Sequence, residues 1–78
     1  MIYHAIHLCP YGGIVRHPKT LEIKVTQLGD FDSMADATAQ ACYQLQCQEL
    51  RDGILTRGYG LGGYLILDAQ ELAELCAS

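Results

Sequence analysis

Hydrophobic and polar residues alternate over several short segments of this chain, a pattern typical of β-strands with one apolar face. Residues 2–8 alternate in this way, and a Pro- and Gly-containing turn at 9–13 follows them. Residues 14–17 form a second extended piece, and 20–28 show the clearest alternation. In that last segment the residues predicted to face inward are Leu21, Ile23 and Val25. The first third of the chain is therefore predicted to form three antiparallel strands.

Apolar residues at helical spacing predict a long helix from Met34 to Asp52. Ser33, with Asp36 three residues later, has the pattern of a helix N-cap, and Gly53 follows the predicted end as a C′ glycine. A helix of this length presents an apolar surface wider than a sheet alone needs to cover.

The last third of the chain predicts a hairpin and a second helix. Residues 54–57 and 64–67 are short strand candidates on either side of a glycine-rich loop. Asp68 followed by Glu71 then opens a short helix whose apolar residues share one face. The predicted fold is α+β in the order β-β-β-α-β-β-α, with an antiparallel sheet of four to five strands and both helices packed on one face.

The length and composition fit one packed domain spanning residues 1–78. Half of the 78 residues are hydrophobic and 18% are charged, which is too apolar for intrinsic disorder. A chain this short is close to the lower limit of independent stability, so formation of a homodimer would be a natural way to bury more surface.

The net charge of −4 indicates which class of partner the protein can bind. The five basic residues are scattered along the chain, so the basic footprint of a nucleic-acid-binding protein is missing. We therefore expect no direct binding of nucleic acid and instead a protein partner with a basic surface.

Segments for targeting or membrane insertion are not predicted. The first 13 residues carry no lysine or arginine, and the longest uninterrupted aliphatic run is residues 65–67. We expect a cytoplasmic protein that does not bind membranes, and without a signal peptide the four cysteines are expected to be reduced thiols.

The glycine-rich segment RGYGLGGY at residues 57–64 matches two nucleotide-binding patterns by letter. Gly58, Gly60 and Gly63 satisfy the dinucleotide-binding G-x-G-x-x-G, but that motif must open a helix, and YLIL follows here. The segment also resembles the box of an RNA-recognition motif that stacks bases on aromatic residues, although Leu61 replaces the central aromatic. A tyrosine-bearing hairpin loop is the interpretation that fits the flanking strands, and a small RNA-binding module stays open as an alternative.

Metal binding and catalysis have few candidate residues. His4, His7, Cys9 and His17 invite a zinc interpretation, but His4 is predicted to face away from His7 and Cys9, and the spacing of a zinc site is missing. Serines and cysteines show no arrangement with a base and an orienting group. We predict no metal, no cofactor and no enzymatic activity, with a small metal-binding module as an alternative.

Three aspartates near the long helix are the best candidates for contact with a partner. Asp30, Asp32 and Asp36 suit the positive end of the helix dipole, and the same carboxylates could compete for a surface lined by arginine or lysine. Tyrosines among glycines add rigid, amphipathic contact area. The predicted partner-binding residues are Asp30, Asp32, Asp36, Tyr11, Tyr59, Tyr64, Glu71 and Glu74.

Two resemblances imply a protein inhibitor. From Gly12-Gly13 through Val25 to Gly29-Asp30 and the alanine-rich helix, residues 12–53 resemble the HicB-type antitoxin domain, which implies neutralisation of a small ribonuclease toxin. That family's Phe-Pro-Asp-Leu-Pro-Gly segment is missing from this chain. In its brevity, acidity and lack of catalytic motifs the chain is similar to phage anti-CRISPR proteins, which implies binding to a Cas effector subunit.

Overall fold

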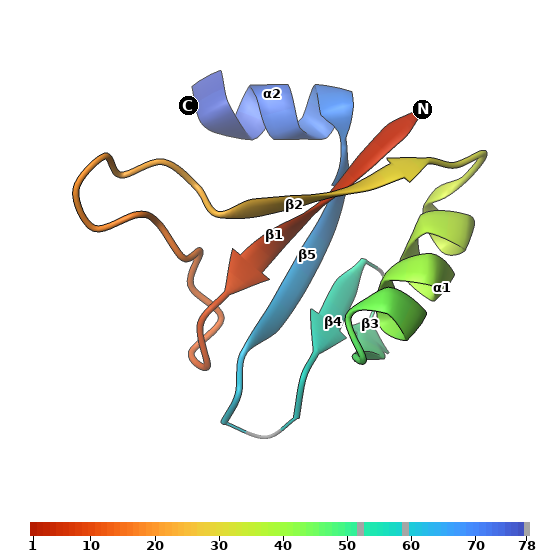
Figure 1. The fold of residues 1–78 in the computed structure, drawn as a ribbon, viewed down its shortest axis with the longest axis horizontal. Helices are drawn as coiled ribbons and strands as arrows, with labels where there is room; N and C mark the ends of the chain where they lie inside the picture. The colour runs from red at the N-terminus through yellow and green to blue at the C-terminus, as the bar shows by residue number, and fades with distance from the viewer. Residues whose placement is uncertain (52, 59, 78) are drawn as a thin grey trace.

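A computed structural model describes residues 1–51, 53–58 and 60–77 of the chain (Figure 1). The described part forms a single sheet with two helices. The elements are β1 (Ile2–Leu8), β2 (Val25–Asp30), α1 (Met34–Gln44), β3 (Gln48–Arg51), β4 (Ile54–Thr56), β5 (Gly63–Asp68) and α2 (Ala69–Ala77). The predicted α+β class and antiparallel sheet are confirmed, but the predicted order β-β-β-α-β-β-α is wrong. The observed order is β-β-α-β-β-β-α, because residues 14–17 form only isolated bridges and a strand follows α1.

The sheet has five strands in the order β2-β1-β5-β4-β3, and every neighbouring pair is antiparallel. β1 lies between β2 and β5, so the N-terminal strand is an interior strand of the sheet although it is first in the chain (Figure 1). β5 pairs along its whole length with β1, from Gly63 opposite Leu8 to Asp68 opposite Tyr3. The strands at the two edges are β2 and β3, which flank α1 in the sequence.

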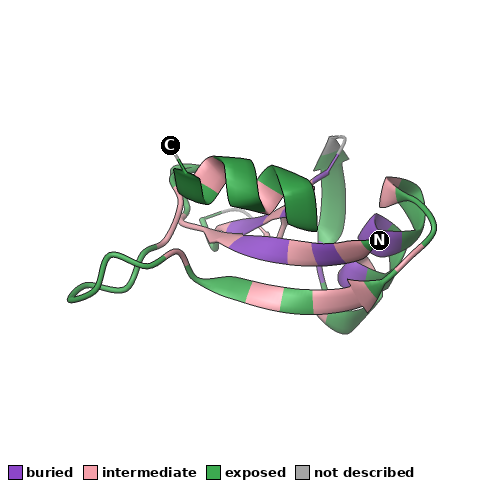
Figure 2. Cartoon of the chain, turned by 90° about the horizontal axis from the view of Figure 1, so that it is seen from above, coloured by how far each residue is buried: buried purple, intermediate pink, exposed green. Residues whose placement is uncertain are grey.

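The main core lies between α1 and one face of the sheet. Tyr3 and Ala5 of β1 and Ile66 of β5 are buried there against Ala37 and Ala41 of α1. The small alanine side chains let the helix approach the strands closely. In β1 the buried residues are Tyr3 and Ala5 on the α1 face and Ile6 on the other face, and Figure 2 shows the burial of the strands by colour. The first helix is thus held by its alanine stripe.

The second helix lies on the opposite face of the sheet, which corrects the prediction that both helices share one face. Residues of α2 line a cavity together with His4 and Val25, and His4 alternates with the buried Tyr3 and Ala5. Because successive residues of a strand point to opposite faces, the two helices cover different sides of the sheet. None of the residues of α2 is fully buried.

The strand predicted at 20–28 begins only at Val25, and the face that it turns toward the main core is the opposite of the predicted one. β2 begins at Val25, which is 37% exposed, and Leu21 is 64% exposed with a backbone φ of 64°. Thr26, opposite Ala5, lies on the α1 face instead. The register with β1 decides this, because Val25 is paired with Ile6, on the face that only the small helix α2 covers.

The helix predicted to run to Asp52 ends at Gln44, and β3 follows it. Gln46 adopts a φ of 55°, and the Cys47 amide donates to the Cys42 carbonyl at 3.0 Å. The Leu45 amide donates to the Ala41 carbonyl at 2.8 Å. The bond from Cys47 is the closing bond of a Schellman motif, with Gln46 in the position that usually holds glycine. The chain reverses there and Cys47 is buried beside the helix instead of extending it.

The glycine-rich segment connects β4 and β5, as predicted for a hairpin loop. Gly58, Gly60 and Gly62 all have positive φ angles. At Gly63 a side chain would collide with the Leu55 carbonyl oxygen of the neighbouring strand. The glycines therefore serve the turn and the close approach of two strands, which accounts for them without a nucleotide.

Candidate functional site

The three predicted aspartates gather around one shallow hollow at the N-terminal end of α1. The hollow has a volume of about 390 Å³. The residues that line it are Asp30, Phe31, Asp32, Asp36, Ala39 and Gln40. We call this surface the acidic hollow.

The end of β2 and the first turn of α1 position these carboxylates. Ser33 is the N-cap of α1, and its hydroxyl accepts a hydrogen bond from the Asp36 amide at 3.2 Å, as the sequence predicts. The N-terminal ammonium of Met1 donates to the Asp30 carboxylate at 2.6 Å. Within the described part of the chain, the carboxylates of Asp32 and Asp36 have no hydrogen-bonding or ion-pair partner, and both residues are exposed. Capping is thus performed by the serine hydroxyl, which leaves these two carboxylates accessible to a ligand.

Phe31 adds an aromatic surface to the acidic hollow. Its ring lies 6.4 Å from the ring of Tyr3, centroid to centroid, at an interplanar angle of 58°. An arginine guanidinium can stack on such a ring while it donates to neighbouring carboxylates. The sequence prediction missed Phe31, although its place between Asp30 and Asp32 was a usable signal. The arrangement suits recognition of a cationic side chain.

The predicted contact tyrosines have different environments. Tyr11 is 97% exposed at the turn after β1. Tyr64 is only 8% exposed and belongs to the core under α1, so it is not available for surface contact as predicted. Tyr64 is buried because it pairs with His7 of β1. The glycines that precede it in the sequence had suggested an exposed loop residue. Tyr59 lies outside the described residues.

The two glutamates at the C-terminal helix are separate from the acidic hollow. Glu71 forms a reciprocal capping box with Asp68: the Asp68 amide donates to Glu71 Oε1 at 3.2 Å, and the Glu71 amide donates to Asp68 Oδ1 at 2.7 Å. Glu74 is exposed on α2. Neither lines the acidic hollow, so the predicted extension of the acidic cluster is not supported at this site.

The zinc candidates are divided between different environments. His7 Nε2 shares a hydrogen bond of 2.9 Å with the Thr26 hydroxyl. His17 Nδ1 accepts from the amides of Lys19 and Thr20 at 3.2 and 3.4 Å. No group of three or more metal-ligating side chains is found among residues 1–51, 53–58 and 60–77. Burial lowers the pKa of His7, and the positive charges of Lys24 and Arg57 lower it further.

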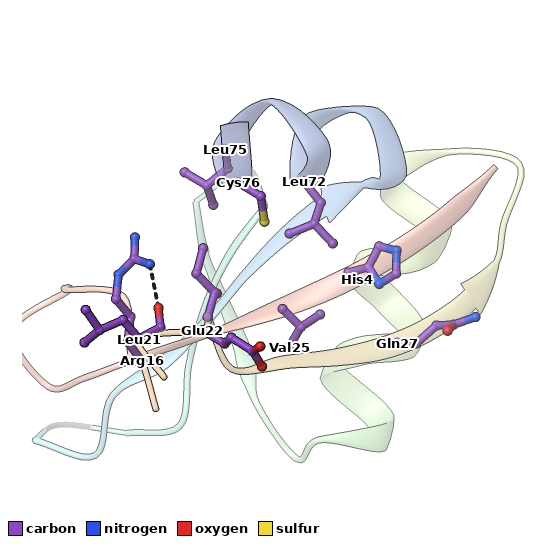
Figure 3. A pocket seen from close by; sticks show the side chains of 10 residues that line it. His4, Arg16, Leu21, Glu22, Val25, Gln27, Leu72, Leu75 and Cys76 are labelled. Atoms are coloured by element: carbon purple, nitrogen blue, oxygen red, sulfur yellow. Dashed lines mark hydrogen bonds between the residues drawn. The ribbon is translucent and has the colours of Figure 1, made fainter. Parts of the chain in front are cut away.

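A second, larger cavity of about 580 Å³ lies between α2, β2 and the segment that precedes β2 (Figure 3). We call it the α2 groove. The residues that line it are His4, Arg16, Leu21, Glu22, Ile23, Val25, Gln27, Leu72, Leu75 and Cys76. The apolar face of the second helix was predicted from the sequence, but the groove beneath it depends on the register and on the face that α2 covers.

Comparison with known protein families, curated proteins and solved structures finds no match to this chain. The helices in the described part of the chain are all too short or too polar to cross a membrane.

Proposed function

We propose that this protein is a non-enzymatic inhibitor that binds a basic surface of a partner protein and thereby blocks binding or cleavage of nucleic acid. The partner class is a Cas effector subunit, as for anti-CRISPR proteins. The observation that carries the proposal is the acidic hollow, in which the carboxylates of Asp32 and Asp36 are exposed and lack partners among the described residues. Two such carboxylates beside Phe31 form a binding site for an arginine or lysine side chain of the partner, one that otherwise binds phosphate.

The proposed mechanism is occupation of a phosphate-binding surface. The net charge of −4 favours approach to a basic partner, and charge complementarity mainly raises the rate of association. Once the complex has formed, a partner arginine stacks on Phe31 and donates to Asp32 or Asp36. Nucleic acid then cannot reach the same basic residue, so inhibition is stoichiometric and needs no turnover.

The test is a binding assay with purified Cas effector complexes and their target DNA. We expect an equimolar amount of the protein to prevent DNA binding, and Asp32→Lys to slow association about five- to tenfold at low salt. Glu22→Lys is the matched control, because it makes the same change in net charge at a residue that lines the α2 groove.

If the two variants slow association equally, the slowing is caused by the change in net charge alone. That result would contradict a specific role for the acidic hollow. A second experiment uses a small ribonuclease toxin of the kind that HicB-type antitoxins neutralise. Neutralisation of the toxin without any effect on the Cas complexes would favour the HicB-like alternative.

A further inference from the structure

The chain reversal at the end of α1 brings two cysteines together. The Cys47 amide donates to the Cys42 carbonyl at 3.0 Å, and Gln46 lies between them with a positive φ. A backbone hydrogen bond between two residues brings their Cα atoms to roughly 5–6 Å, which is within the range that a disulfide spans. In the continuous helix predicted from the sequence, residues 42 and 47 would lie about 140° apart around the axis. Their proximity therefore depends on the early end of α1.

The side chains of Cys42 and Cys47 occupy the two positions of a Schellman motif that commonly contact each other. Leu45 is the C-cap of α1, so Cys42 is at C3 and Cys47 at C″, and a side-chain contact between these positions often accompanies the motif. Cys47 is buried in the main core, and the partly buried Cys42 packs against the same core. The Cys47 thiol donates to the Leu45 carbonyl at 3.3 Å, so it turns back toward the helix.

The electrostatic surroundings of the two thiols agree with this geometry. Burial, the largest cause, raises the pKa of Cys47, the charge of Cys42 raises it further, and Arg57 opposes the rise. Burial also raises the pKa of Cys42, the Glu49 carboxylate adds to the rise, and the Glu49 amide opposes it. Because the thiolate is the reacting form, thiol–disulfide exchange at this pair should be slow at neutral pH and faster in alkaline buffer.

We propose that Cys42 and Cys47 form a reversible disulfide at the end of α1, with a low-molecular-weight disulfide such as oxidised glutathione as the oxidant. The more exposed Cys42 attacks one sulfur of the oxidant as a thiolate, which forms a mixed disulfide and releases one thiol. The Cys47 thiolate then attacks the Cys42 sulfur, which closes the intramolecular disulfide and releases the second thiol. The two protein thiols are oxidised, and the oxidant is reduced to two thiols.

The disulfide would attach the start of β3 to the end of α1, because Cys47 directly precedes that strand. Cross-linking restricts the unfolded chain, so we expect oxidation to raise the melting temperature by about 5–10 °C. The acidic hollow lies at the other end of the same helix and contains no cysteine among its lining residues. Oxidation is therefore expected to leave the hollow unchanged.

The test is equilibration of the full chain in glutathione buffers, followed by an acid quench, alkylation with N-ethylmaleimide and digestion with trypsin. Cleavage after Lys24 and Arg51 places both cysteines in the peptide 25–51, whereas Cys9 and Cys76 lie in other peptides. We expect mass spectrometry to show the loss of two hydrogens from this peptide. The intramolecular disulfide should exceed the glutathione adduct about tenfold or more, and this ratio should fall severalfold in concentrated urea, because the fold supplies the proximity.

The matched control combines Cys47→Ser with Gln48→Cys, which keeps two thiols in the same peptide but moves one of them to an exposed position of β3. Successive strand residues point to opposite faces, so this variant should form mainly glutathione adducts. If the control does not fold, the comparison of the wild type with and without urea still decides the question. Glutathione adducts alone in the wild type, an equal ratio in urea, or equal disulfide formation in a folded control would overturn the proposal.

Discussion

The His7 imidazole meets the Tyr64 ring edge to face across β1 and β5, with ring centroids 4.9 Å apart and an interplanar angle of 72°. The same imidazole shares a hydrogen bond with Thr26 of β2. His7 therefore links three neighbouring strands on one face of the sheet. The neutral imidazole is favoured at this position. Partial burial, the largest cause, lowers the pKa of His7, and the positive charges of Lys24 and Arg57 lower it further.

This environment predicts that acid destabilises the protein through His7. The folded-state pKa is below the ordinary histidine value of about 6.5, so the unfolded chain binds more protons between these two values. Stability from this group is present above pH of about 6.5 and is lost as the pH falls toward the folded-state pKa. Thermal unfolding from pH 7.5 to 5 should show a decline that is smaller in His7→Gln. An unchanged pH profile in that variant would contradict the prediction.

A substitution at Gly63 should be severely destabilising. A methyl group at this position meets the Leu55 carbonyl oxygen of β4, a backbone atom that cannot move without breaking strand pairing. We expect Gly63→Ala to lower the free energy of unfolding by about 3 kcal/mol or more, measured by urea denaturation. Gly13→Ala is the control, because a methyl group there only reaches the Cys9 sulfur at 3.4 Å. Similar losses in both variants would show that the strands separate more easily than the structure indicates.

The end of α1 gives a prediction with the opposite sign. Gln46 has a φ of 55° and is exposed, so Gln46→Gly removes backbone strain without removing a core contact. We expect stabilisation of about 0.5–1 kcal/mol. Gln44→Gly, two residues earlier in the last helical turn, should instead destabilise by about 1 kcal/mol. Destabilisation by both substitutions would mean that the helix continues through residue 46, as the sequence pattern alone predicts.

The candidate site was predictable where local rules apply. Ser33 was identified as a cap, and Asp30, Asp32 and Asp36 were grouped, because residues close in sequence around a helix start are close in space. The same local rule extends to Phe31, which lies between two of these aspartates. The prediction that Tyr64 is exposed is wrong for a different reason. The burial of Tyr64 depends on its pairing with His7, more than fifty residues earlier in the chain. Loop composition suggested exposure, and strand register reversed it.

The sequence by itself determined the α+β class, the positions of β1 and β5, both helix starts and the hairpin at the glycine-rich loop, because alternation, caps and turns are encoded by neighbouring residues. Only the tertiary structure decided the early end of α1, the strand order β2-β1-β5-β4-β3 and the opposite faces of the two helices. Those features depend on which strand pairs with which, and a shift of one residue in register moves every side chain to the other face. The α2 groove exists because the register of β1 and β2 places His4 and Val25 on the face of the sheet that α2 covers.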